Sequence, residues 1–342
     1  MTTQHKLSIE IARMKILIVG LGSIGRRHLK NLSALGVRQL AAVTKSRGGA
    51  FSDTLPPFLS FENLETALEW QPDAVFVCNP SALHLETALT AAKAGCHLFL
   101  EKPVSHSLEG IYELEQLVER QNLRVQVGFQ YRFHGVFQQI KTVIERGHLG
   151  KILAAHAHWG EYLPDWHPWE DYRQSYSARE DLGGGVLRTL CHPFDYLRWF
   201  AGDVTGVHAV GGHLSELETD TEDVALVSLQ FENGAIGSVY LDYVSRPAQH
   251  RLQIIGEKGR IEWDNASGAA KVYSKGGTAV EAISPGIFFE RNEMFRAEAA
   301  AFLDVVQQGR PHTACTLQDG IRTLEIALRA KAMLEKTALE VA

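Results

Sequence analysis

A short apolar run, Ile16–Val19, leads directly into a turn with glycines at three set positions. After the turn, apolar residues recur at helical spacing until Gly36 ends the pattern. A buried strand, a tight turn and a helix in this order predict the start of a parallel, doubly wound sheet. In such a turn the first glycine allows the bend, the second lets a phosphate approach the backbone, and the third lets helix and strand pack closely.

The helix that follows this turn would present free N–H groups and a partial positive charge to an anion. The turn therefore predicts a dinucleotide site, and the alternative is a glycine-rich turn that binds no ligand. The expected contacts from this segment are Gly20, Gly22, Ser23, Ile24 and Gly25.

Strand and helix patterns alternate up to about residue 130 and then change character. The expected strands of the first part are 39–44, 74–78, 96–100 and 124–129, and its expected helices include 83–93 and 108–120. Alternation of this kind predicts a parallel sheet with right-handed crossovers. Longer segments of alternating polarity follow, which predict a second sheet. These segments are 151–159, 204–213, 224–231, 235–243, 250–255 and 260–263.

We therefore expect an α/β chain of two domains. Residues 1–128 are predicted to form an N-terminal Rossmann domain, a doubly wound parallel sheet. Residues 129–342 are predicted to form a C-terminal α+β domain for substrate binding and oligomerisation, with a large open, mostly antiparallel sheet and helices on one face. Two helices are expected at 290–309 and 317–336. They belong to this second domain, and the alternative is that they pack against the Rossmann domain.

Composition and charge exclude several classes of function. The 342 residues carry a formal net charge of -6, so no basic excess indicates nucleic acid or a membrane surface as partner. Four scattered cysteines without CxxC spacing favour a reducing compartment over a zinc or disulfide framework. With no apolar segment typical of a signal peptide or a membrane span, we expect a cytoplasmic protein.

The end of the second expected strand bears on the choice of dinucleotide. An acidic residue about 20 positions after the glycine turn usually holds the ribose hydroxyls of NAD. This chain has Thr44, Lys45, Ser46 and Arg47 instead, without a carboxylate. Hydroxyls and cations suit a 2′-phosphate, so the sequence favours NADP over NAD, and the alternative is an ordinary solvated turn.

Two further motifs stand where expected strands end. Asn79-Pro80-Ser81, with His84 three residues on, follows the strand at 74–78, and Glu101-Lys102-Pro103 follows the strand at 96–100. A lysine is usually a solvated surface residue. At a strand end it has a different interpretation, because doubly wound sheets bind ligands outside the carboxyl ends of their strands.

Taken together, several segments resemble the glucose–fructose oxidoreductase/inositol dehydrogenase/MocA (Gfo/Idh/MocA) family. They are Glu101-Lys102-Pro103, Asn79-Pro80-Ser81-x-x-His84, the segment Gly128–His134, and Gly183-Gly184-Gly185 followed by His192 and Asp195. The resemblance extends from about Met14 to the last expected helix.

This resemblance implies an NAD(P)-dependent oxidoreductase that moves a hydride between nicotinamide and a secondary alcohol or carbonyl of a sugar, nucleotide-sugar or cyclitol. Lys102 and His192 would hold the reacting oxygen and handle its proton, with the base being either of them. Glu101 would hydrogen-bond the ribose or orient Lys102. The cofactor contacts implied beyond the glycine turn are Asn79, Pro80, His84, Glu101, Lys102 and Gln130.

The chain departs from the family pattern just before His192. Many members carry an aspartate three or four residues earlier, where this chain has Thr189 and Arg188. This departure supports an alternative function, a catalytically impaired dinucleotide-binding sensor or regulatory protein. Pro193 predicts that the regular helix begins near His192 or bends there. Asp195 either orients the imidazole or pairs with Arg198.

The segment 161–179 is dense in aromatic and polar residues. Aromatic faces suit the C–H side of a sugar, and Arg and Tyr suit hydroxyl or acidic groups, although packing against another subunit is the alternative. The expected substrate contacts are Lys102, Arg132, Tyr162, Trp166, Tyr172, Arg173, Thr189 and His192.

His156, His158 and His167 could imitate a metal site, but hydride transfer needs none and we expect no metal. Because a large open sheet has a face and an edge to cover, we expect a homo-oligomer, a dimer or a tetramer.

Overall fold

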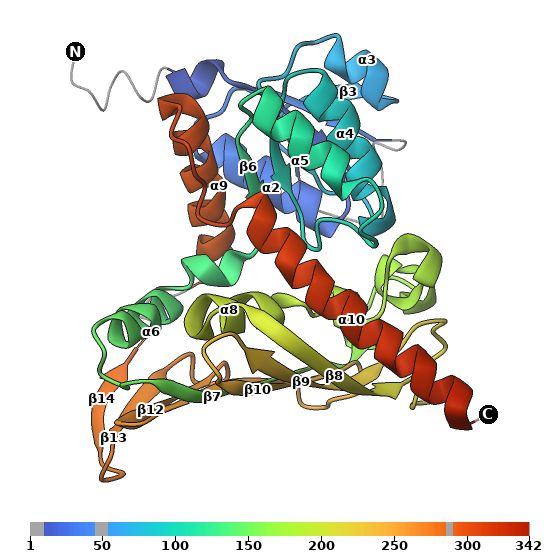
Figure 1. Cartoon of the computed structure of the whole chain (residues 1–342). Coiled ribbons are helices and arrows are strands. Elements are labelled where there is room, and N and C mark those ends of the chain that lie inside the picture. The colour runs from blue at the N-terminus through green and yellow to red at the C-terminus, as the bar shows by residue number, and fades with distance from the viewer. Residues whose placement is uncertain (1–9, 45–53, 285–289, 342) are drawn as a thin grey trace. The chain divides into compact units, whose positions relative to one another are not determined.

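The computed structural model describes residues 10–44, 54–284 and 290–341, and the chain divides into two compact units (Figure 1). The first unit contains residues 1–130 and 291–321, and the second contains residues 131–290 and 322–342. The first unit is therefore built from two stretches of chain that are far apart in the sequence.

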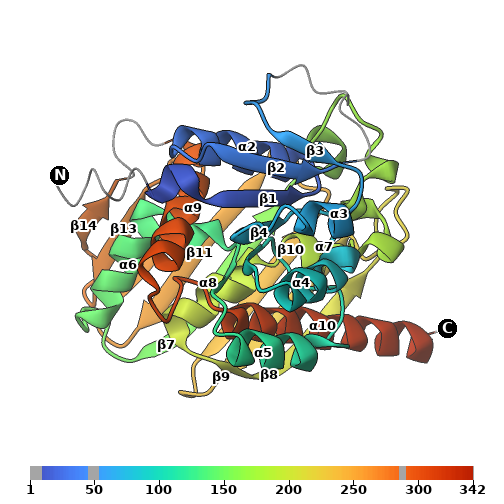
Figure 2. The same ribbon diagram turned by 90° about the horizontal axis from the view of Figure 1, so that it is seen from above.

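A six-stranded parallel sheet forms the centre of the first unit, with strand order β3-β2-β1-β4-β5-β6. Its strands are β1 (Lys15–Val19), β2 (Gln39–Val43), β3 (Leu59–Phe61), β4 (Ala74–Val77), β5 (His97–Leu100) and β6 (Val125–Val127). Its helices before residue 130 are α2 (Ser23–Ala34), α3 (Leu64–Leu68), α4 (His84–Lys93) and α5 (Ile111–Arg120), with the short 3-10 helix η1 (Ser81–Leu83) (Figure 2). The strand order reverses between β1 and β4, which is the position where doubly wound sheets bind ligands.

A helix from late in the chain completes the core of this unit. Helix α9 (Arg291–Gln308) packs against α2 and inserts Phe302, which is fully buried. The Phe302 ring lies edge-on to Phe76 at 5.6 Å and to Phe99 at 5.7 Å, and those two rings stack at 4.5 Å. Phe76 and Phe99 project from β4 and β5, so α9 covers the two strands whose ends carry the motifs singled out above.

The second unit is built on an eight-stranded sheet in the order β14-β13-β12-β11-β7-β10-β9-β8. The strands are β7 (Ile152–Gly160), β8 (Val204–Gly212), β9 (Val224–Phe231), β10 (Ile236–Asp242), β11 (Gln249–Gly256), β12 (Gly259–Asp264), β13 (Ala270–Ser274) and β14 (Ala279–Ile283). Strands β7 and β10 run parallel, and the other neighbours run antiparallel. The expected fold class, a Rossmann sheet plus a large, mostly antiparallel sheet, is confirmed.

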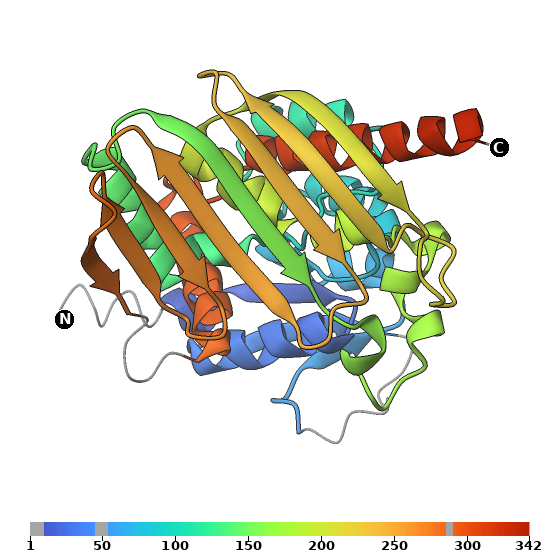
Figure 3. The same ribbon diagram turned by 90° about the horizontal axis from the view of Figure 1, so that it is seen from below.

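Helices cover one face of this second sheet. They are α6 (Gly135–Glu145), α7 (Val186–Thr189), α8 (His192–Ala201) and the part of α10 (Leu317–Val341) that belongs to this unit (Figure 1). Trp159 and Val239 are buried on the strands, and Tyr196 and Phe200 are buried on α8. Figure 3 looks on to the opposite face, where no helix among the described residues lies.

Several elements had no counterpart in the sequence analysis. Strand β3 has only three residues, and β14 is exposed at every position except Ile283, so neither carries a buried-strand pattern. The strands that were predicted are either fully buried, as β4 is, or alternate in burial, as β9 does. Among the described residues, no helix has both the length and the apolar character to cross a membrane.

Candidate active site

The glycine turn of the first unit packs tightly against the end of β4. A Cβ on Gly20, whose φ is +96°, would lie 2.7 Å from the backbone nitrogen of Asn79. A Cβ on Gly25 would lie 1.9 Å from the carbonyl oxygen of Gly20. At Gly22 a Cβ would meet nothing within 4 Å among the described residues, and α2 begins there without a side-chain cap. The first and third glycines thus close the turn, while the second leaves open space at a helix N-terminus, where an anion is favoured.

Beside the turn, His84 joins the two strand-end motifs. Its Nε2 atom lies 2.8 Å from the carbonyl oxygen of Asn79, and its Nδ1 atom lies 2.7 Å from that of Pro103. Burial lowers the pKa of His84, against the raising effect of these two carbonyls. A neutral imidazole carries one N–H, so it donates to one carbonyl at a time. Both ring nitrogens face the backbone, and His84 therefore braces the ends of β4 and β5.

The side chain of Asn79 links the end of β4 to α4. Its Nδ2 donates to Thr87 Oγ1 at 2.8 Å, and its Oδ1 atom is buried with no hydrogen-bond partner among the described residues. A buried amide oxygen without a donor is uncommon and indicates a missing partner.

The Glu101-Lys102-Pro103 motif directly follows β5. Lys102 is half-buried, and its backbone N–H donates to Glu101 Oε2 at 3.3 Å. The Glu101 carboxylate is buried and lies against His28 of α2, with Nε2 and Oε1 at 2.7 Å. Burial raises the pKa of Glu101, but the hydrogen bond and charge of His28, with Lys102 and His84, lower it by more, so the net shift is downward. Glu101 therefore stays ionised.

The remaining predicted cofactor contacts of this unit are placed as follows. Ser23 is exposed and Ile24 half-buried in the first turn of α2. Thr44 directly follows β2, and its N–H donates to the carbonyl of Phe61. Pro80 precedes η1, and Gln130 is buried at the end of the unit. Lys45, Ser46 and Arg47 lie outside the described residues.

In the second unit His192 is the first residue of α8, as the position of Pro193 predicted. The His192 side chain is buried. Its ring stacks on Trp159 at 5.3 Å with an interplanar angle of 17°, and it meets Tyr131 edge-on at 5.4 Å. Thr189, also buried, closes the short helix α7 three residues earlier. The imidazole is therefore held by aromatic rings from η2 (Gln130–Phe133) and β7.

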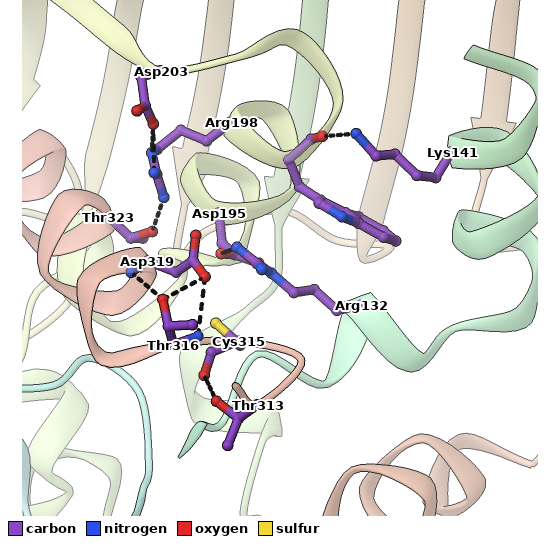
Figure 4. A network of polar contacts seen from close by, with 11 residues as sticks. Arg132, Lys141, Asp195, Arg198, Asp203, Thr313, Cys315, Thr316, Asp319 and Thr323 are labelled. Atoms are coloured by element: carbon purple, nitrogen blue, oxygen red, sulfur yellow. Dashed lines mark hydrogen bonds and ion pairs between the residues drawn. The ribbon is translucent and has the colours of Figure 1, made fainter. Parts of the chain in front are cut away.

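Asp195, one turn along α8, has a partner that neither sequence interpretation named. Arg132 binds it with two parallel hydrogen bonds, Nε to Oδ2 at 3.0 Å and Nη2 to Oδ1 at 2.7 Å (Figure 4). Arg198 instead donates to Asp203, with Nη2 and Oδ1 at 2.5 Å. The buried guanidinium of Arg132 is engaged by Asp195 and fixes the first turn of α8 to η2. The expected contact of Arg132 with substrate stays a prediction.

Arg188 occupies a position where an aspartate is common in the family. Its buried guanidinium donates to Glu180 Oε2 at 2.5 Å and to the carbonyl of Gly184 at 2.7 Å. Lys331 of α10 lies 3.2 Å from Glu180 and 3.5 Å from Glu222, which is also buried. Burial raises the pKa of Glu222 despite Lys331. This ion cluster holds the glycine segment before His192, and sequence reasoning missed Glu222 and Lys331 because they are far away in the chain.

Polar groups of the predicted substrate segment bind partners both within the segment and far from it in the chain. Tyr172 Oη accepts from the Glu218 N–H at 3.0 Å, and Arg173, which is exposed, pairs with Asp171 and Glu218. The other two aromatic residues of the prediction also have partners. Tyr162 lies under the Arg246 guanidinium at 3.7 Å, and Trp166 meets Tyr243 edge-on at 5.6 Å.

The histidines that could imitate a metal site have other partners. His156 Nδ1 lies 2.8 Å from Ser238 Oγ, and His158 Nε2 lies 3.6 Å from Asp242 Oδ2. The His167 ring lies 5.2 Å from Trp169. In the described part of the chain, no three His, Cys, Asp or Glu residues are grouped so as to hold a metal ion.

Comparisons with known proteins agree with this architecture. Residues 14–129 match the model of an oxidoreductase family with an NAD-binding Rossmann fold, and residues 137–262 match the GFO/IDH/MocA C-terminal domain. An uncharacterized oxidoreductase, YrbE, of Bacillus subtilis is 29% identical over 93% of both chains. A myo-inositol 2-dehydrogenase of Thermotoga maritima is also 29% identical, over 94% of this chain and 97% of that protein.

Among solved structures, a levoglucosan dehydrogenase in complex with NADH and levoglucosan superposes with a TM-score of 0.82 at 20% identity. The match covers 94% of this chain and 97% of that one. The chain belongs to the Gfo/Idh/MocA family and is an oxidoreductase with an NAD-binding Rossmann domain.

The three glycines of the turn give a matched test of dinucleotide binding. Gly22→Ala is expected to change the free energy of unfolding by no more than about 1 kcal/mol, because the new Cβ has open space. It should raise the dinucleotide Kd by about tenfold or more, equal to about 1.4 kcal/mol, because the methyl group occupies the anion's approach. Isothermal titration calorimetry and urea unfolding measure the two quantities.

Unlike Gly22→Ala, Gly25→Ala should destabilise the fold. It should lower the free energy of unfolding by about 3 kcal/mol, because the new Cβ would meet the Gly20 carbonyl. Gly135→Ala, in open space at the start of α6, is the control and should change neither quantity. Unaltered dinucleotide affinity in Gly22→Ala would show that no phosphate approaches this turn.

Proposed function

We propose that this protein transfers a hydride between a nicotinamide dinucleotide and the secondary alcohol or carbonyl carbon of a sugar, nucleotide-sugar or cyclitol. Its relative from Thermotoga maritima, matched over nearly the full length, is named for oxidation of a cyclitol. The observation that carries the proposal lies in the first unit. The glycine turn packs on Asn79, and His84 joins Asn79 to Pro103, so the turn and Lys102 share one edge of the sheet.

In the oxidative direction the electron pair of the C–H bond leaves with the hydride, and the hydroxyl proton passes to a protein base. When bound, the nicotinamide would supply the hydride acceptor. Lys102 and His192 are the groups that we propose to hold the reacting oxygen and to exchange its proton, because an amine and an imidazole do both. Trp159 and the Arg132–Asp195 pair hold the ring and the helix of His192.

The proposal is tested with a panel of sugars, nucleotide-sugars and cyclitols read at the absorbance of reduced nicotinamide. Lys102→Met and His192→Gln should each lower kcat by about 10²-fold or more. The dinucleotide Kd should stay within about threefold in His192→Gln, because His192 is not among the expected dinucleotide contacts. Lys93→Met is the control, because Lys93 is 59% exposed and pairs only with Glu113 at 2.9 Å among the described residues. Tight dinucleotide binding without turnover of any compound would favour the sensor function instead.

We further propose that NADP is preferred over NAD. The support is the sequence Thr44–Arg47, which offers hydroxyl and cationic groups and no carboxylate for the ribose. With an active substrate, kcat/KM should be higher for NADP by about tenfold, and Arg47→Ala should lower this ratio because a partner for the 2′-phosphate is removed. A wild-type ratio in favour of NAD would overturn this preference.

We also propose that the open face of the second sheet pairs with a second copy of the chain. Val210, Leu226 and Tyr240 lie side by side across β8, β9 and β10 on this face, and Ile236 of β10 is 60% exposed. Uncovered apolar surface of this kind marks interaction sites.

A dimer or tetramer is therefore expected by sedimentation velocity. Ile236→Lys should shift the protein toward the monomer, because burying an unpaired ammonium group is costly. Leu59→Lys, at a 51% exposed position of the first unit, should not. A monomeric wild-type protein at tens of micromolar would contradict the proposal.

A further inference from the structure

A buried histidine, His28, contacts the side chain of Glu101, the residue before Lys102, and has no role in the chemistry proposed above. We infer that His28 is a positioning residue of the active site, which holds the Glu101 carboxylate and through it the backbone that presents Lys102. The inference rests on the proposed role of Lys102. It adds a residue of the dinucleotide-binding helix α2 to the apparatus of the reaction.

One hydrogen bond and three phenyl rings set the position of His28, while its buried Nδ1 has no hydrogen-bond partner among the described residues. Its side chain is fully buried, and its Nε2 lies 2.7 Å from Glu101 Oε1. Its ring meets Phe99 edge-on at 4.9 Å, and the ring of Phe76 lies at 5.3 Å. Phe295 of α9 lies at 6.4 Å. A ring enclosed by three phenyl groups keeps one orientation, and that orientation directs Nε2 at the carboxylate.

Glu101 is as tightly held as its partner. Oε1 faces His28, and Oε2 accepts the Lys102 N–H. On the third side stands Gly128, directly after β6, where a Cβ would come within 3.2 Å of the carboxyl group. With both oxygens engaged, the carboxylate fixes the peptide that leads into Lys102.

The charges around Glu101 show what His28 contributes. Burial alone raises the pKa of this carboxyl group, and the hydrogen bond and charge of His28 are the largest effects that lower it. Lys102 and His84 also lower the pKa of Glu101. The other neighbours are Arg27, whose charge interacts with Glu101, and the Cys78 thiol, whose pKa is raised by burial and by Glu101. Without His28, the effect of burial is less opposed, so the pKa of Glu101 rises.

Helix α2 thereby contributes both to the proposed dinucleotide site and to the position of Lys102. The N-terminus of α2 lies at the open space of Gly22, and His28 lies less than two turns further along the same helix. One turn beyond His28, on the same face of α2, the Asn31 and Asn292 amides form two reciprocal hydrogen bonds that tie α2 to α9. The dinucleotide site and the Lys102 peptide are thus fixed to one rigid element.

The test compares His28→Leu, His28→Asn and His28→Gln in the full-length protein. Glutamine places an N–H donor near the position of Nε2, and asparagine and leucine do not. We expect His28→Leu and His28→Asn to lower kcat by about 10²-fold, with substrate KM and dinucleotide Kd changed by less than about threefold. His28→Gln should recover at least about tenfold of that loss, which a residue that only fills space would not do.

The pH dependence provides a second readout. In His28→Leu the acid limb of the kcat profile should move to higher pH, because the pKa of Glu101 rises when its partner is lost. His97→Gln is the matched control at the other end of β5, where His97 Nδ1 accepts the Arg124 N–H. This variant should keep both kcat and the pH profile.

A third readout does not depend on turnover. In the wild-type protein the lowered pKa of Glu101 stabilises the fold above the carboxyl group's unfolded pKa of about 4.3, and this stabilisation is lost as the pH falls. The difference in Tm between wild type and His28→Leu should therefore widen from pH 4 to pH 7. If the panel shows no turnover but the Tm difference widens, the proposed function fails and the His28–Glu101 coupling stands. Parallel Tm curves, or equal kcat in the leucine and glutamine variants, would overturn the inference.

Discussion

The close packing of the Gly20 turn on the end of β4 is the contact on which the geometry of the first unit depends. A Cβ on Gly20 would meet the backbone of Cys78 and Asn79, and a Cβ on Gly25 would meet the Gly20 carbonyl, so only glycine lets the turn lie directly against the end of β4. Because β1 and β4 are neighbours at the reversal of strand order, this contact brings the turn beside the next strand end. His84 and Glu101 then extend the arrangement to β5 with hydrogen bonds. These contacts bring the glycine turn, where we propose that the dinucleotide binds, and Lys102 to one edge of the sheet.

The parts of the fold that could be predicted are those with a local cause. Strand β4 is buried at all four positions, and β9 alternates regularly, so their sequences carry the pattern of their environment. Pro193 predicted that the helix begins near His192 or bends there, and the first of these is observed, because proline is accepted in the first turn of a helix. Strand β14 lies at an edge with its side chains exposed, so nothing in its sequence marked it as a strand.

The partners of the site residues could not be predicted, because they are long-range pairs. Asp195 and Arg132 are 63 residues apart, and His28 and Glu101 are 73 apart. From sequence alone, Arg198 was the nearest cation to Asp195, yet it bonds Asp203. Arg188 shows the same limit. The sequence showed that no aspartate stands at this position, but it did not show that the Arg188 guanidinium binds Glu180 and the Gly184 carbonyl and so supports the segment that leads into His192.

Both proposed proton-handling groups are backed by a buried charged or polar pair, His28–Glu101 for Lys102 and Arg132–Asp195 for His192. Removing one partner of such a pair is destabilising, but replacing the whole pair with apolar residues of similar volume is often neutral or stabilising, because desolvation cancels most of the attraction between the partners. Stability therefore does not account for them at these positions. Geometry does, because a bidentate guanidinium–carboxylate pair and an imidazole enclosed by phenyl rings each allow one arrangement, where an apolar contact allows many. One pair thus holds the peptide that leads into Lys102, and the other holds the first turn of the helix that begins at His192.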